Sequence, residues 1–176
     1  MIMRPGQPLL LPARSLFIWG SVIAAFVFNM LMNMAVLGRA AAMPDLLAVV
    51  LVFWTVHQPQ RVNIGAAFVF GLFMDVHQTS LLGLHALSYT VLSFLAVSIH
   101  RRLLWFTVPS QTLHVLPLFV AAHVLDLVVR LLTGSAWPGW ALVLAPLLES
   151  LLWPVVSVLL LLPQRRPPDP DANRPL

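Results

Sequence analysis

The feature that most constrains this chain is a succession of apolar runs, several of them long enough to cross a lipid bilayer. The first extends from Leu16 to Leu37 without a charged residue. About 20 such residues suffice for a helix to span a hydrocarbon core of ~30 Å. Apolar residues make up 60% of the sequence and charged residues only 9%, and the mean hydropathy is +0.90. The sequence therefore predicts an all-α, polytopic membrane protein.

Five further apolar segments follow the first run. They cover residues 44–57, 62–74, 84–99, 111–132 and 138–162. We therefore expect a bundle of about six transmembrane helices over residues 16–162. A cytoplasmic segment, 1–15, precedes it, and a proline-rich, disordered cytoplasmic tail, 163–176, follows it. The first run exceeds the ~7–15 residues of a signal-peptide core, so it is predicted to stay uncleaved.

The second and third segments are shorter than a bilayer crossing usually requires. They fit either a re-entrant hairpin or two thin crossings. A hairpin would put Arg61 inside the membrane, where an arginine costs at least ~2.5 kcal/mol. Two crossings are favoured, with Pro44 at a helix start and Pro59 blocking continuation of the second helix.

The arginines predict the orientation. All ten basic residues are arginine. If the N-terminus is cytoplasmic, eight of them lie on the cytoplasmic side, leaving only Arg39 and Arg130 on or near the other. Cytoplasmic loops are enriched in basic residues, so both termini are predicted to be cytoplasmic.

Composition and motifs also argue against several function classes. There is no cysteine, which excludes disulfides, thiolate chemistry and cysteine-based zinc sites. The sequence contains no phosphate-binding glycine loop, no metal-binding helix signature and no nucleophile in a recognisable elbow. We therefore expect no enzymatic activity and no cofactor. We also expect no nucleic-acid partner, because the distribution of the arginines is explained by membrane topology.

Three stretches of the sequence carry a family resemblance. They are "MPDLLAVVLVFWTVHQPQRVNIGAAFVFGLFMDVHQTSLLGLHALSY", "QTLHVLPLFVAAHVLDLVV" and "SLLWPVVSVLLL". Together they resemble MreD, the bacterial rod shape-determining membrane protein. The matching positions are Pro44, Trp54, Pro59, Arg61, Val62, Gly71, Asp75, Ser80, Leu82, Gly83, Gln111, Asp126, Trp153 and Pro154. One position departs, since Thr79 stands where the pattern has glycine.

The resemblance implies a non-enzymatic subunit of the cell-elongation (Rod) complex in the bacterial inner membrane. Its implied partners are MreC and, within the same complex, MreB, RodA and the elongation transpeptidase, besides membrane lipid. The family's fold is thought to be similar to the substrate-binding S-components of energy-coupling-factor (ECF) transporters. That likeness leaves open a small-molecule-binding or transport subunit, which predicts an enclosed cavity near Asp126 and Glu149.

Gly71, Asp75 and Gly83 form the first candidate contact region for a partner or ligand. Gly71 and Gly83 are small enough to let a neighbouring helix approach closely. Asp75 is expected at the membrane interface, either hydrated or accepting backbone N–H bonds from the following turn; a partner contact is the alternative. A metal site with His77 and His85 has no defensible ligand spacing.

Asp126 and Glu149 are the second candidates, because each lies within an apolar run where a charge facing lipid is unfavourable. Asp126 is spaced to pair with Arg130 on one helix face, or else to dock another subunit or a ligand. Glu149 lies between Pro146 and Pro154, which free backbone carbonyls and kink a helix. It is expected either to bond such a carbonyl while protonated or to line a central polar pocket.

Overall fold

The computed structural model describes residues 13–35, 43–78, 81–134, 139 and 141–164. Within these ranges the chain forms six α-helices, one terminal 3₁₀ turn and no strand. The helices are α1 (Ser15–Ala35), α2 (Leu46–His57), α3 (Ile64–Gln78), α4 (Leu84–Leu103), α5 (Val108–Leu132) and α6 (Ala141–Leu161). The predicted all-α bundle is thus confirmed. The expectations for Arg39, Thr79, Ser80 and most of the two terminal segments lie outside the described residues.

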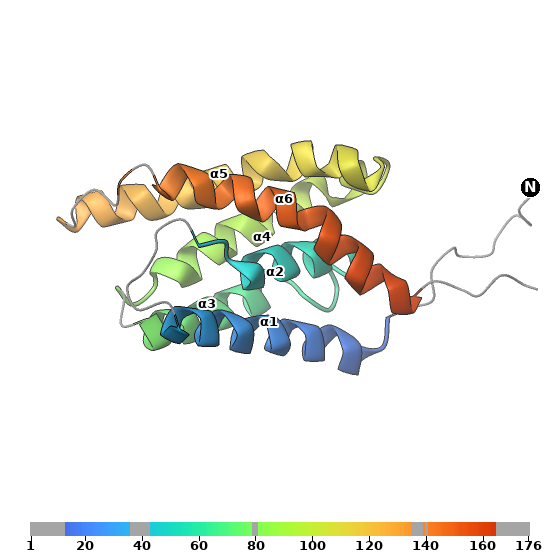
Figure 1. The fold of residues 1–176 in the computed structure, drawn as a ribbon, viewed down its shortest axis with the longest axis horizontal. Helices are drawn as coiled ribbons and strands as arrows, with labels where there is room; N and C mark the ends of the chain where they lie inside the picture. The colour runs from blue at the N-terminus through green and yellow to red at the C-terminus, as the bar shows by residue number, and fades with distance from the viewer. Residues whose placement is uncertain (1–12, 36–42, 79–80, 135–138, 140, 165–176) are drawn as a thin grey trace, which may run out of the picture.

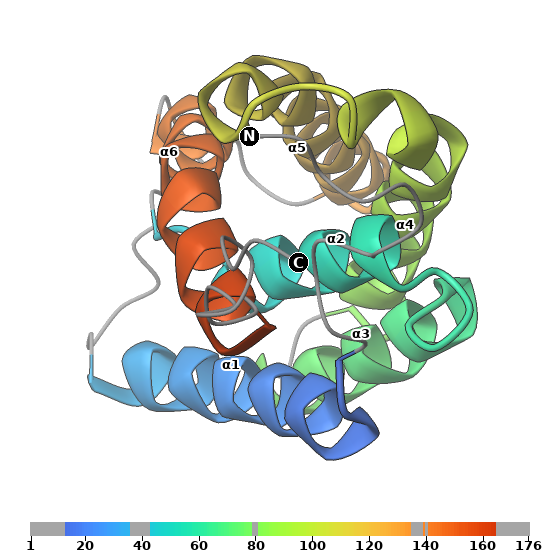
Figure 2. The same ribbon diagram turned by 90° about the vertical axis from the view of Figure 1, so that its right-hand side faces the viewer.

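The helices lie side by side as a bundle, with α2 in the middle (Figures 1 and 2). Helix α2 contacts α1, α4 and α6, and every residue from Leu47 to Val56 is buried. A helix surrounded by protein in this way need not match the full thickness of the lipid. The expectation that α2 and α3 each cross the bilayer stays a prediction.

The outer helices carry apolar side chains toward the surroundings. Among the described residues, three helical segments are long and apolar enough to cross a membrane: Ser15–Met34, Val108–Leu132 and Val143–Gln164. Large apolar side chains stand exposed along them, as at Leu113 (73%) and Leu151 (65%). A bundle that is apolar outside as well as inside suits a lipid environment.

One detail at the start of α2 differs from the sequence-based expectation. Pro44 does not open the helix, because Asp45 is the N-cap residue and its carboxylate accepts the Ala48 N–H. Trp54 matches the family near the end of α2, but it is fully buried and donates its indole N–H to Ser21 at 2.8 Å. Pro59 does follow the end of α2, at His57, as predicted.

The matching positions Gln111 and Trp153 join α5 and α6. Both side chains are buried, and the Trp153 indole N–H donates to Gln111 Oε1 at 3.1 Å. The Gln111 amide in turn donates to the carbonyls of Leu103 and Phe106. A buried indole or amide needs such partners, so these residues hold the α4–α5 turn against α6.

Candidate functional site

Gly71 places α3 and α4 in direct backbone contact. A Cβ atom at Gly71 would lie 2.4 Å from Ala86 Cα and 2.6 Å from the Ala86 backbone nitrogen. Real Cβ atoms do not approach a backbone that closely, so only glycine allows this packing. The expectation of a close helix approach at Gly71 is confirmed.

Asp75, one turn further along α3, binds the N-terminus of α4. Its carboxylate accepts the backbone N–H groups of Gly83 (2.8 Å), His85 (2.8 Å) and Ala86 (3.3 Å). The His85 side chain contacts the same carboxylate through Nδ1 at 2.8 Å. Unpaired N–H groups at a helix start favour a negative charge. Of the two expected environments for Asp75, the structure shows the backbone N–H bonds and not hydration, because Asp75 is only 1% exposed.

Gly83 contributes to the contact between α3 and α4, but not in the expected way. It is the N-cap residue of α4, with φ of +100° and no capping side chain, and a Cβ there would meet no atom within 4 Å. Its role is therefore a left-handed backbone conformation and not the close approach of a helix. Asp75 supplies from α3 the cap that the glycine lacks.

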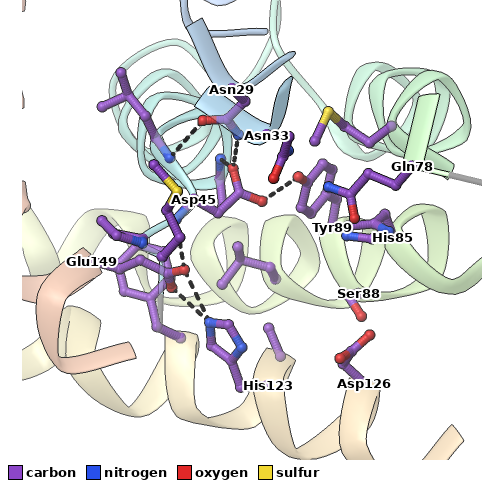
Figure 3. Close-up of a pocket in the computed structure, with 18 of the residues that line it drawn as sticks. Asn29, Asn33, Asp45, Gln78, His85, Ser88, Tyr89, His123, Asp126 and Glu149 are labelled. Atoms are coloured by element: carbon purple, nitrogen blue, oxygen red, sulfur yellow. Dashed lines mark hydrogen bonds and ion pairs between the residues drawn. The ribbon is translucent and has the colours of Figure 1, made fainter. Parts of the chain in front are cut away.

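A cavity of about 640 Å³ opens at the end of the bundle where α1, α3 and α5 end and α2 and α4 begin (Figure 3). Its walls come from all six α-helices and from the segment that leads into α2, and they include Asp126 and Glu149. The structure thus brings the second pair of candidates into one pocket. The cavity predicted near them is present, although it is partly open and not enclosed.

Asp45 organises the inner wall of this pocket. Its carboxylate accepts hydrogen bonds from the Asn29 amide, the Tyr89 hydroxyl and the Ala48 N–H, and the first two are drawn in Figure 3. The Asp45 backbone N–H donates to Glu149 Oε1 at 3.1 Å. One residue therefore connects α1, α2, α4 and α6.

Glu149 completes this network from α6. It is 1% exposed, and both carboxylate oxygens lie 3.0 Å from His123 Nε2. The expected bond to a carbonyl freed by proline is wrong, because its partners are His123 and the Asp45 N–H. A buried acid is tolerable when hydrogen-bonded in this way, which places Glu149 in a polar pocket instead.

Asp126 lies at the same pocket, one turn along α5 from His123. Its Oδ2 accepts the Arg130 Nε–H at 2.8 Å, which confirms the predicted pair. The Arg130 side chain remains 32% exposed and that of Asp126 15% exposed. The pair thus lies at the accessible part of the pocket, whereas Glu149 lies at its buried wall.

The five candidates therefore separate into a junction and a pocket. Gly71, Asp75 and Gly83 shape the start of α4, whereas Asp126 and Glu149 line the cavity. Within the described residues, no three His, Cys, Asp or Glu side chains are grouped to hold a metal ion.

Sequence reasoning missed three polar members of the pocket network, namely Asn29, Asp45 and Tyr89. An asparagine inside an apolar run and an aspartate directly before a helix were the available signals.

Comparison with known proteins identifies the family. The family model described as rod shape-determining protein MreD matches residues 13–162. The chain belongs to the MreD family. A rod shape-determining protein MreD from Haemophilus influenzae is 30% identical over 148 residues, which cover 81% of this chain and 89% of that protein. No solved structure matches the chain, so the likeness to ECF S-components stays a prediction.

Membership of MreD makes the chain a membrane protein of a shape-determining family. The family match begins before α1 and ends in the terminal turn, so it includes every described helix. Both the junction and the pocket consequently lie in the MreD-like part of the chain.

Proposed function

We propose that the chain is a non-enzymatic inner-membrane subunit of the cell-elongation (Rod) complex, with both termini cytoplasmic. In this role it binds MreC and helps organise lateral peptidoglycan synthesis and rod shape. MreB, RodA and the elongation transpeptidase are its further partners within the complex. The observation that carries the proposal is the family match over residues 13–162.

The pocket supports a role in recognition. Cavities of roughly 300–1,000 Å³ with a few convergent polar groups are typical of binding sites, and this one measures about 640 Å³. With both termini cytoplasmic, its opening would face the periplasm, where Asp126 offers a polar docking point. The apolar outer faces of the helices offer a second surface, suited to a transmembrane helix such as that of MreC.

Co-purification tests the proposal. The affinity-tagged protein is extracted from its own membranes in mild detergent, and MreC is quantified in the eluate by mass spectrometry. We expect MreC to be enriched relative to an unrelated tagged membrane protein of similar abundance. Recovery of MreC at the level of that control would contradict direct binding.

Asp126→Asn refines this experiment, because asparagine preserves the shape of the side chain and removes its charge. If the charge helps dock a partner, the variant recovers less MreC and fails to restore rod shape to a deletion strain. Arg130→Lys is the matched control, since it keeps an opposite charge beside Asp126. Normal shape with Asp126→Asn would refute a charge-dependent role.

The cavity also favours a second candidate function, a small-molecule-binding or transport subunit of the S-component type. That function requires a space beside Asp126 and Glu149, and such a space exists. It predicts a ligand that is released when the purified protein is denatured. Release of a stoichiometric ligand, together with no recovery of MreC, would favour this second function over the first.

A further inference from the structure

One side chain in the pocket has a hydrogen-bonding capacity that the protein does not use. Ser88 on α4 lines the cavity, is 8% exposed, and its hydroxyl has no hydrogen-bond partner. Figure 3 shows Ser88 and Asp126 pointing toward one another from α4 and α5. An unpaired buried hydroxyl is costly, so a group that enters the pocket would satisfy it.

Carboxylates outnumber arginines among the charged side chains of the pocket. Three lining residues are carboxylates, Asp45, Asp126 and Glu149, whereas Arg130 is the one arginine among the described lining residues. An ionised carboxylate offers about four acceptor positions. Among the described residues, the Arg130 Nε–H provides the one hydrogen bond to the Asp126 carboxylate. The excess of carboxylates therefore favours a cationic ligand group and disfavours an anion.

Arg130 shows which kind of group fits beside Asp126. Its guanidinium already bonds the carboxylate from the accessible side, at 2.8 Å. The arginine side chain is one-third exposed, so it can turn outward when another cation takes its place. The Arg130–Asp126 pair thus occupies part of the position that a ligand cation would use.

The walls suit an apolar stem attached to that cation. Met32, Met74, Leu92 and Phe119 line the same cavity, and the last three are almost fully buried. Their surfaces would cover the methylene groups of such a stem, and burial of apolar surface stabilises binding.

We propose that this pocket binds a guanidinium or primary ammonium group on an apolar stem, with Asp126 and Ser88 as the contacts and Arg130 as the internal competitor. This inference rests on the pocket being a recognition site, as the proposed function has it, but it does not require MreC to be the occupant. The cation belongs either to an Arg or Lys side chain of a partner segment or to a free amphiphilic molecule.

Binding of n-butylguanidinium tests the chemistry. The full chain is reconstituted in phosphatidylcholine nanodiscs, and titration calorimetry is corrected with empty nanodiscs. We expect saturable binding of n-butylguanidinium and n-butylammonium, and binding at least tenfold weaker for butyrate and n-butanol. Equal binding of butanol, or no saturable binding of either cation, would overturn the inference.

Two neighbouring variants have opposite expected effects. Asp126→Asn should weaken n-butylguanidinium binding by about tenfold or more, because a charge-assisted hydrogen bond is lost. Arg130→Gln should strengthen it by about two- to fivefold, because the competitor is removed. General damage to the fold would weaken binding in both variants, so a loss in Arg130→Gln would overturn the inference even if Asp126→Asn does not fold.

The source of the cation is a separate measurement. A small cation released from natively purified, denatured protein identifies a free ligand, whereas competition by a partner peptide that depends on its Arg or Lys identifies a side chain. Failure to recover MreC would refute the proposed partner, while cation binding by the purified protein would still stand.

Discussion

The sharpest structural prediction concerns Gly71→Ala. The added Cβ would lie 2.4 Å from Ala86 Cα and 2.8 Å from the His85 carbonyl carbon. Ordinary contact begins near 3.4 Å, so α4 must move away from α3 by on the order of 1 Å. These are backbone atoms of a helix start, so no side-chain rotation relieves the contact.

The energetic cost follows from two effects. Overpacking of a close-packed interior costs roughly 1–3 kcal/mol. Movement of α4 also stretches the bonds from Asp75 to the N–H groups of Gly83 and His85, now 2.8 Å each, and loss of a helix cap costs about 1 kcal/mol. We therefore expect Gly71→Ala to lower the free energy of unfolding by roughly 2–4 kcal/mol.

The assay is equilibrium unfolding by sodium dodecyl sulfate in mixed micelles, followed by circular dichroism. Gly20→Ala in α1 is the matched control, because a Cβ there meets no atom within 4 Å. Alanine is the better helix former, so the control should be neutral or slightly stabilising. A loss for Gly71→Ala within about 0.5 kcal/mol of the control would refute the backbone contact.

Three further predictions use the same unfolding assay. Asp75→Asn should destabilise the protein by about 1–3 kcal/mol, because a neutral amide is a poorer acceptor for the N–H groups of α4; a neutral effect would contradict the cap. Tyr89→Phe should cost about 1 kcal/mol by removing the hydroxyl that donates to Asp45, and an unchanged stability would argue against that bond. In a double-mutant cycle, His123→Gln and Glu149→Gln should show a coupling of roughly 0.5–3 kcal/mol; additive effects would mean that the two side chains are independent.

The sequence predicted the helices well because they are continuous apolar runs whose ends are marked by charges and prolines. It predicted the Asp126–Arg130 pair because partners four residues apart share a helix face. The Asp45 network could not be predicted in this way. Asp45 and Glu149 are 104 residues apart in the chain, and only the packing of α2 inside the bundle brings them together.

Two side chains near helix ends are buried, which their positions in the sequence do not show. Sequence spacing shows where a helix ends but not whether that end is covered by neighbours. Trp54 therefore lies in the core although it sits near a helix end, and Asp75 is buried although it sits near the end of α3. In both cases tertiary packing decides the burial of the side chain.

The most direct test of the account is the shape of cells depleted of this protein in the bacterium that encodes it. Cell length and width are measured by microscopy during depletion, with re-expression of the wild-type chain as the control. We expect the cells to widen and become round, and re-expression to restore rods. Cells that keep their rod dimensions after the protein has disappeared would contradict a role in shape determination.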